Sequence, residues 1–408
     1  MINDARIQVF EAHQADRGIS LEEVKRRLKQ LKIETPSWGY GDSGTRFQVF
    51  KKAGVPRTTF EKMEDAAQVH RFTGLSPSVA IHIPWDKVDD YSRLREHTES
   101  LGIKIGAVNP NLFQDDDYML GSITHTDQAI RRKATAHLRE CVAIAREVGS
   151  DIVSLWLADG TNYPGQADIR KRKRWMEEAL RETYRELDQG MRLLIEYKFF
   201  EPAFYHTDLA DWGMAFNLAT KLGPQAEVLV DTGHHPQGTN VEHLVAYLLD
   251  EERLGGFHFN GRKYADDDLI VGTTNPYEIF LIFYQIVAAL REEENAGARR
   301  TAERIAYMID QSHNIEPKIP AMIRSVLNVQ TLYAKALLIN WKELEEAQVD
   351  LDVLRAEAAV REAFEQDVEP LLHMVREERG LPPEPMKAFL ESGYVEKIQD
   401  RGVGGASW

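Results

Sequence analysis

Residues 226–235 have the sequence AEVLVDTGHH, in which a short apolar run ends in Asp231 and is followed by His234. A run of this length, rich in valine and leucine and bounded by polar residues, is typical of a buried strand in a parallel sheet. Polar residues at the carboxyl end of such a strand are typical of the ligand-binding edge of an α/β protein. This stretch therefore predicts both a buried strand and part of a functional site.

The same pattern recurs along the chain, with helical sequence between the runs. Seven further runs are IETPSWGYGDSGTRF (33–47), SVAIHIPW (78–85), IKIGAVNPN (103–111), DIVSLWLADG (151–160), MRLLIEYKF (191–199), GGFHFN (255–260) and RIAYMIDQSHN (304–314). Eight strands that alternate with helices predict an α/β fold, a (β/α)8 TIM barrel. A doubly wound open sheet is disfavoured because no GxGxxG or P-loop motif follows any run.

The regions outside the predicted barrel are helical. Residues 1–35 are expected to form an N-terminal extension, in which Ser20 and Glu23 have the spacing of a capping box. Residues 36–320 are assigned to the catalytic barrel. Residues 321–408 are charge-rich, and we expect additional C-terminal helices there that pack against the barrel or a neighbouring subunit.

Composition disfavours several classes of partner and compartment. The formal net charge is −15, whereas binding to nucleic acid or an anionic membrane requires a basic surface. The single cysteine, Cys141, permits no disulfide within the chain, which favours a reducing compartment. The N-terminal sequence lacks the apolar core of a signal peptide, and no run has membrane-spanning length. We therefore expect a cytoplasmic protein that binds neither nucleic acid nor membrane.

Most of the predicted strands end in polar or aromatic residues, which a barrel gathers on one face. These residues are His82, Trp85, Asn109, Trp156, Asp159, Glu196, Lys198, Asp231, His234, His258, Asn260, Asp310 and His313. Four late strands each carry a possible metal ligand, namely Glu196, Asp231, His258 and Asp310. Carboxylates with one imidazole and no thiolate suit Mn²⁺, Co²⁺ or Mg²⁺.

A second set of possible ligands lies near the first in the sequence. His234 follows Asp231 by three residues, and Asp266 and Asp268 alternate in YADDDL, so that both could face one ion. Asp231 would then bridge the two sets. Taken alone, an acidic triplet is usually a solvated loop, and a single histidine on a strand is usually a hydrogen-bonded core residue. The joint pattern favours a metal site.

At these residues the sequence resembles the L-rhamnose isomerase family, in particular its shorter bacterial type of broad specificity. The matching segments lie between about residues 36 and 318 and are SWGYGDSGTRF, HIPWD, EYKFFEP, VDTGHHPQGTN, FHFNGRKYADDDLIVGTTNPYEIF and YMIDQSHN. The xylose isomerases are more distant relatives that share the barrel and a two-metal arrangement. The resemblance implies isomerisation of L-rhamnose to L-rhamnulose, with other aldoses such as D-allose as further substrates.

The resemblance also implies a role for each matching residue. The ligands of a first, structural ion would be Glu196, Asp231, His258 and Asp310, and those of a second, catalytic ion Asp231, His234, Asp266 and Asp268, with Mn²⁺ the expected metal. Lys198, Asp310 and His82 are the expected catalytic residues. The sugar pocket would be lined by Trp38, His82, Trp85, Trp156 and Lys198, and Phe47 would reach a neighbouring subunit's pocket in a homotetramer. From spacing alone, the tryptophans could equally be core residues, and Phe47 could pack within its own chain.

Aldose–ketose isomerisation moves one hydrogen between C1 and C2 and requires negative charge to be stabilised on O1 and O2. Two divalent ions supply this as Lewis acids, while Lys198 would stabilise charge on O1 and Asp310 would position a water that carries the hydroxyl proton. The resemblance implies a hydride transfer, and the sequence leaves a proton transfer through an enediol open.

Two alternative functions are weighed against isomerisation. A ketose 3-epimerase would use two carboxylates flanking one metal, with a glutamate on the last strand; Asp310 and the paired aspartates Asp266 and Asp268 favour the isomerase. A non-catalytic sugar-binding barrel would not need so many convergent acidic residues, because their mutual repulsion is costly without cations.

Overall fold

Eight parallel strands form one sheet in a computed structural model, which describes all residues except 1–3, 46, 202–205, 264–267, 313–314 and 405–408. In spatial order the strands are β1 (Thr35–Pro36), β4 (Ser78–Ile83), β5 (Lys104–Pro110), β6 (Ile152–Trp156), β8 (Arg192–Glu196), β10 (Ala226–Asp231), β11 (Leu254–Phe259) and β12 (Ala306–Ile309). A parallel bridge between Glu34 and Met308 joins the first strand to the last. The predicted TIM barrel is confirmed, and each of the eight predicted runs overlaps one of these strands.

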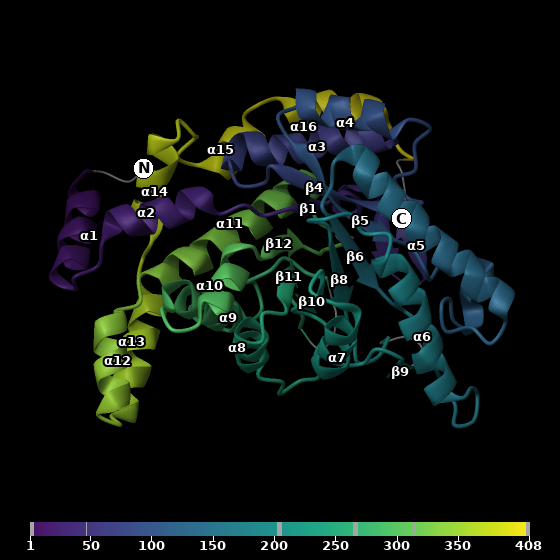
Figure 1. Ribbon diagram of the computed structural model, residues 1–408. Coiled ribbons are helices and arrows are strands. Elements are labelled where there is room, and N and C mark those ends of the chain that lie inside the picture. The colour runs from purple at the N-terminus through teal and green to yellow at the C-terminus, as the bar shows by residue number, and fades with distance from the viewer. Residues whose placement is uncertain (1–3, 46, 202–205, 264–267, 313–314, 405–408) are drawn as a thin grey trace.

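Helices cover the outside of the barrel (Figure 1). They are α3 (Thr59–Thr73), α4 (Tyr91–Ser100), α5 (Gln128–Val148), α6 (Ile169–Tyr184), α7 (Trp212–Leu222), α8 (Val241–Asp250), α9 (Pro276–Arg291), α10 (Ala296–Glu303) and α11 (Lys318–Leu337). Most of them begin after a side chain that accepts a hydrogen bond from the first turn, as Thr58 does for α3 and Asp90 for α4. These capping side chains therefore fix the residue at which most of these helices begin.

Short elements lie in the loops that follow the strands. They are the 3-10 helices η1 (Ser37–Tyr40) and η2 (Asp116–Leu120), the hairpin of β2 (Ser43–Thr45) and β3 (Gln48–Phe50), and the pair β7 (Gly160–Thr161) and β9 (His206–Thr207). The loop after β1 thus carries η1 and the β2–β3 hairpin, the longest structured excursion of the first half of the barrel. Such loops carry the functional residues of a TIM barrel.

The apolar core has two parts. The larger part fills the space between strands and helices. The smaller part lies inside the barrel and consists of Ala80, Ala107, Ile152, Leu194, Leu229 and Met308, against which Trp38 packs. Because side chains alternate along a strand, these inner residues fix which later residues of each strand also face inward.

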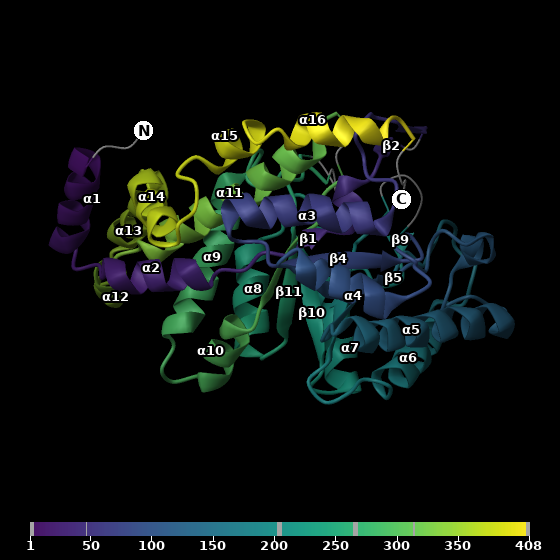
Figure 2. The same cartoon turned by 90° about the horizontal axis from the view of Figure 1, so that it is seen from above.

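Two helical extensions flank the barrel. The N-terminal one comprises α1 (Asp4–Asp16) and α2 (Leu21–Gln30), and Ser20 accepts a hydrogen bond from the Glu23 amide at 3.4 Å, as its capping-box spacing predicts. The C-terminal helices are α12 (Trp341–Val349), α13 (Val353–Glu365), α14 (Glu369–Glu378), α15 (Pro385–Leu390) and α16 (Tyr394–Ile398), followed by η3 (Gln399–Arg401). Figure 2 shows α15 beside α3, and α14 packs against α1 and α2. The additional C-terminal helices are confirmed, while the domain boundaries at residues 35 and 320 remain predictions.

Candidate functional site

The alternation of side chains along the strands brings the candidate ligands into the barrel mouth. Leu194 and Leu229 belong to the inner core, so Glu196 and Asp231, two residues further along β8 and β10, also face inward. By the same spacing His82 follows Ala80, and Asp310 follows Met308. Since these residues stand at the carboxyl ends of parallel strands of one barrel, they converge on one face of it.

Four of the predicted residues form a compact group. Glu196, Asp231, His258 and Asp310 each offer one ligand atom, and these atoms all lie within 4.8 Å of one another. His258 is central, because its Nδ1 lies 3.1 Å from Glu196 Oε2 and 3.5 Å from Asp310 Oδ2. Within the described residues, no other set of three or more such side chains comes this close.

The electrostatics of this group favour a bound cation. Burial lowers the pKa of His258, but the negative charges of Glu196, Asp310 and Asp231 outweigh burial and raise it. Burial raises the pKa of the Glu196 carboxyl, yet the neighbouring imidazoles of His258 and His234 lower it overall. Glu196, Asp231 and His258 are buried and Asp310 is partly exposed. These three carboxylates and one imidazole therefore attract positive charge, and oxygen-rich donors of this kind fit a divalent ion such as Mn²⁺ or Mg²⁺.

Asp231 is oriented by polar groups behind it. The amide nitrogen of Asn260 donates to both carboxylate oxygens, at 2.9 Å and 3.1 Å, and the Gly233 amide donates to Oδ1 at 2.6 Å. Asn260 follows His258 by two residues, so both face the mouth from the end of β11. Hydrogen bonds of this type fix the direction in which a ligand's free lone pairs point.

The second predicted set is only partly brought together. His234 lies in the loop after β10, with Nδ1 3.2 Å from Glu196 Oε1 and Nε2 3.9 Å from Asp231 Oδ2. Asp268 is half-buried and has a positive φ of 47°, and its carbonyl accepts a hydrogen bond from Ser312. Asp266 lies outside the described residues, as does His313. The metal role of His234, Asp266 and Asp268 remains a prediction.

An aromatic surface borders the ligand group, and we call it the aromatic wall; its members are Trp38, His82, Trp85, Phe113 and Trp156. His82 stacks on Trp85 with ring centroids 4.0 Å apart and meets Trp38 edge-on at 5.5 Å. The indole N–H of Trp38 donates to Asp310 Oδ1 at 2.8 Å, which attaches the wall to the ligand group. Each predicted pocket tryptophan therefore lies at the barrel mouth.

Phe113 is the member of the aromatic wall that was not predicted from the sequence. Its ring contacts Trp156 at 4.9 Å and His82 at 5.7 Å between centroids, so it closes the gap between the early and later strands. Phe113 follows the end of β5 by three residues, within NPNLF. Its position just beyond a strand end was the available signal.

Lys198 lies two residues beyond the end of β8 and is buried. Its ammonium lies 5.2 Å from the ring centroid of Trp156 and forms an ion pair with Glu201 at 3.0 Å. Lys198 is therefore not a surface lysine. A buried ammonium beside the aromatic wall is suited to contact a polar ligand.

Two other sequence candidates occupy different positions. The side chain of Phe47, in the turn of the β2–β3 hairpin, is 82% exposed. Asp159 is buried and accepts hydrogen bonds from the hydroxyls and amides of Ser122 and Thr124, so it ties two loops together. Asp159 therefore serves the loop structure within this chain.

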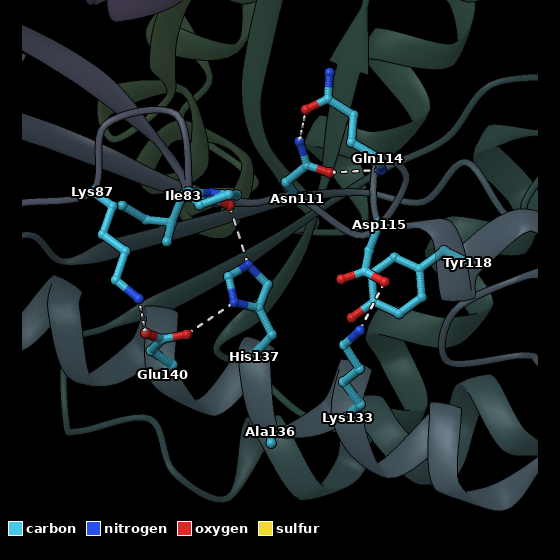
Figure 3. A pocket seen from close by; sticks show the side chains of 11 residues that line it. Ile83, Lys87, Asn111, Gln114, Asp115, Tyr118, Lys133, Ala136, His137 and Glu140 are labelled. Atoms are coloured by element: carbon cyan, nitrogen blue, oxygen red, sulfur yellow. Dashed lines mark hydrogen bonds and ion pairs between the residues drawn. The ribbon is translucent and has the colours of Figure 1, made fainter. Parts of the chain in front are cut away.

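A separate cleft of about 490 Å³ opens between α5 and the loops after β4 and β5 (Figure 3). Its polar side chains pair with one another: Lys133 binds Asp115 at 2.7 Å, and His137 contacts Glu140 and the Ile83 carbonyl. Gln114 on its rim accepts a hydrogen bond from the Trp85 indole, which joins the cleft to the back of the aromatic wall. The ligand group lies in the barrel mouth and not in this cleft.

The fold and the position of this group define a TIM barrel whose chemistry would take place at the carboxyl ends of its strands. The chain belongs to the xylose isomerase-like TIM barrel family, whose model matches residues 64–283. Across the part of the chain that the structure describes, no helix combines the length and apolar character needed to cross a bilayer.

Two relatives match nearly the whole chain. A probable sugar isomerase of Rhizobium meliloti is 40% identical over 94% of this chain and 89% of its own length. A probable sugar isomerase of Mesorhizobium japonicum is 39% identical over 94% of this chain and 88% of its own. Among solved structures, an L-ribulose 3-epimerase superposes with a TM-score of 0.52 and 15% identity, covering 82% of this chain and 97% of that one, which shows a shared fold. The predicted resemblance is thus confirmed for the barrel family and for sugar isomerases as a group.

Proposed function

We propose that this protein is a metal-dependent aldose–ketose isomerase whose natural substrate is L-rhamnose. The observation that carries the proposal is the convergence of Glu196, Asp231, His258 and Asp310 beside the aromatic wall and Lys198. Isomerisation of an open-chain sugar needs a cation at its oxygens and apolar surfaces at its carbon faces, and this mouth has residues for both. Homology to probable sugar isomerases over almost the full length supports the reaction class.

The choice of L-rhamnose rests on the segments around the ligand group. These segments, among them VDTGHHPQGTN and FHFNGRKYADDDL, resemble the L-rhamnose isomerases of broad specificity. D-Allose and related aldoses are proposed as further substrates, because the aromatic wall offers flat surfaces that do not select one hydroxyl pattern.

We assign the metal sites to residues of this chain. The first ion would be held by Glu196, Asp231, His258 and Asp310, and the second by Asp231, His234, Asp266 and Asp268. Mn²⁺ is the proposed ion, with Co²⁺ and Mg²⁺ as alternatives that the same donors accept. When bound, such ions polarise sugar oxygens as Lewis acids.

The side chains of this chain position the sugar and move its protons. As the aldose becomes the ketose, hydrogen leaves C2 with its electron pair and reaches C1, while the O2 proton is transferred to O1. Lys198 stabilises the charge that develops on O1, and Asp310 positions a water that takes the proton from the O2 hydroxyl and returns it at O1. Trp38 and Trp156 exclude water from the reacting carbons, and His82 contacts the sugar from the β4 side.

The proposal extends to assembly and location. A homotetramer is proposed in which Phe47 enters a neighbour's pocket, since an exposed phenyl on a projecting hairpin is stabilised when a partner buries it. The N-terminal segment 1–35 and the C-terminal segment 321–408 would then support the barrel segment 36–320. The cytoplasm is the proposed compartment, and Cys141 is a buried free thiol.

A ketose 3-epimerase is the second candidate, and one observation favours it. The described residues form one compact ligand group, which matches the single metal that such an epimerase would use. The last strand, however, is followed directly by Asp310, where that chemistry would place a glutamate. The isomerase therefore remains the preferred function.

One experiment separates these functions. Protein supplied with Mn²⁺ is incubated in ordinary water with L-rhamnose deuterated at C2, and in parallel with D-fructose, and products are identified by NMR. The isomerase should yield L-rhamnulose that keeps most deuterium at C1. Inversion at C3 of the ketose without turnover of the aldose would instead identify the epimerase, and binding without turnover would identify a sugar-binding barrel.

A further inference from the structure

A buried ion pair lies directly behind the aromatic wall. Lys62 of α3 contacts Asp86, in the loop after β4, with Nζ 2.7 Å from Oδ1. The two side chains are 1% and 0% exposed, so both charges are removed from water. Replacing both members of such a pair with apolar side chains is often neutral or stabilising, whereas removing one member leaves the other charge buried without its partner, so such pairs are most useful where they fix a geometry.

Asp86 connects the two segments that carry Trp38 and His82 of the aromatic wall. Its Oδ2 accepts a hydrogen bond from the His82 amide at 2.8 Å and another from the Ser37 hydroxyl. Ser37 directly precedes Trp38 in η1, and His82 lies near the end of β4. The Asp86 carboxylate therefore holds both segments through Oδ2, while Lys62 neutralises and orients this carboxylate through Oδ1.

The connection continues to the ligand group. The Trp38 indole is fixed at its other end by Asp310, at 2.8 Å, and its ring meets His82 edge-on. A shift of Asp86 would move Ser37 and His82 together and would tilt the Trp38 ring relative to Asp310. Groups behind a site control it in this way, because displacements of well under 1 Å change how a ligand is positioned.

We propose that Lys62 and Asp86 are positioning residues for the sugar, which set the angle between Trp38 and His82 and the distance of this pair from Asp310. The inference rests on the proposed function, because it assigns the sugar to the aromatic wall. Burial and the charge of Lys62 lower the pKa of His82 to about 3, so the imidazole facing the pocket is neutral. A neutral His82 suits a contact with uncharged hydroxyl groups.

The test compares Lys62→Met with a matched control on the same helix. Asp65 of α3 forms a second buried ion pair, with Arg401 at 2.9 Å, and these side chains are 1% and 8% exposed. Asp65 faces the C-terminal η3 segment and makes no contact with the aromatic wall through its ion pair or through Tyr394. Asp65→Asn should therefore lower the melting temperature as Lys62→Met does but leave the pocket unchanged.

For Lys62→Met we expect KM for L-rhamnose to rise roughly tenfold, with bound Mn²⁺ unchanged and a smaller change in kcat. Ser37→Ala removes one hydroxyl from Asp86 and keeps the ion pair, so it should raise KM in the same direction even if Lys62→Met fails to fold. Equal KM values for wild type, Ser37→Ala and Lys62→Met would overturn the inference. An equal rise of KM in Asp65→Asn would also overturn it, because loss of stability alone would then explain the effect.

Affinity for L-rhamnitol, a polyol without a carbonyl, is measured on the same proteins by calorimetry. Because rhamnitol cannot be isomerised, its dissociation constant reports positioning without turnover. If wild type binds rhamnitol but converts no aldose, the isomerase proposal fails, and the ratio of rhamnitol affinities between Lys62→Met and Asp65→Asn still decides the positioning role. A tenfold weaker affinity in Lys62→Met alone supports it, and equal affinities contradict it.

Discussion

Trp38 donates its indole N–H to Oδ1 of Asp310 at 2.8 Å, although 272 residues separate the two along the chain. Trp38 follows the first strand of the barrel and Asp310 follows the last, so the bond spans the seam where the barrel closes. The other oxygen of Asp310 lies 3.5 Å from Nδ1 of His258. One carboxylate is thus shared between the aromatic wall and the candidate ligand group.

Trp38→Phe should keep an aromatic ring, although a smaller one, and remove this hydrogen bond. A hydrogen bond to a charged group contributes about 1.5–3 kcal/mol, so we expect kcat/KM for L-rhamnose to fall roughly tenfold or more. Bound Mn²⁺ should be unchanged because the ligands remain. Steady-state kinetics and metal analysis of the same preparation check this, and an unaltered kcat/KM would show that the bond has no part in turnover.

Asp231→Asn should lose metal while the barrel stays folded. The amide keeps the size of the carboxylate but removes one negative charge from the ligand group, so Mn²⁺ affinity should fall by more than the roughly 10–100-fold that follows loss of a group behind a ligand. Asp159→Asn is the matched control, because Asp159 is also a buried carboxylate after a strand but contacts Ser122 and Thr124. Equilibrium dialysis should show normal binding in the control, and normal binding in Asp231→Asn would exclude it as a ligand.

The stability of the metal-free protein should fall as the pH drops from about 6.5 toward 5. Burial, followed by the charge of Lys62, lowers the pKa of His82 to about 3, so the folded protein leaves His82 neutral where the unfolded chain takes up a proton. The contribution of His82 to the free energy of unfolding is therefore fully present above the pKa of a histidine in the unfolded chain. It is lost as the pH falls below that value, at about 1.4 kcal/mol per pH unit for one proton. The free energy of unfolding is measured in urea at pH 7 and pH 5. Between these two pH values it should fall less in His82→Phe than in wild type, because the variant takes up about one proton fewer on unfolding. Identical pH slopes would contradict a neutral His82.

Phe47→Ala should hardly change the stability of one subunit, since its side chain is 82% exposed and surface substitutions usually stay within about 0.5 kcal/mol. If Phe47 closes a neighbour's pocket, KM should nevertheless rise and the preference among aldoses should shift, with metal binding intact. Phe50→Ala, on the same hairpin and 44% exposed, is the control. A wild-type protein that is monomeric by sizing at assay concentration, with full activity, would rule out this role.

The barrel was predictable from the sequence because its strands are short and mostly buried. Runs such as AEVLVD and RLLIE have the apolar continuity that parallel strands need, and polar residues mark their carboxyl ends. The group of Glu196, Asp231, His258 and Asp310 followed from the same rule, since strand ends of a barrel share one face. Their role as ligands, and that of Asp266 outside the described residues, stays a prediction.

Contacts that depend on tertiary packing were not predictable. Lys62 occurs in a helix of mixed polarity, where a lysine is usually solvated, and only the approach of α3 to the loop after β4 buries it against Asp86. Phe113 lies in a loop whose path the apolar pattern does not determine, so its contacts with Trp156 and His82 emerged only from the fold. Periodicity identifies which residues face inward, but not which loop residues meet.

The most direct test of the central claim follows metal content and ketose formation in the same samples. Protein is depleted of metal with EDTA, and Mn²⁺ is then added in steps while bound metal is quantified and the conversion of L-rhamnose is followed by NMR. We predict no ketose from the metal-free protein and a rate that rises with bound Mn²⁺ until the sites are filled. Ketose formation at an undiminished rate by protein shown to contain no metal would contradict the claim.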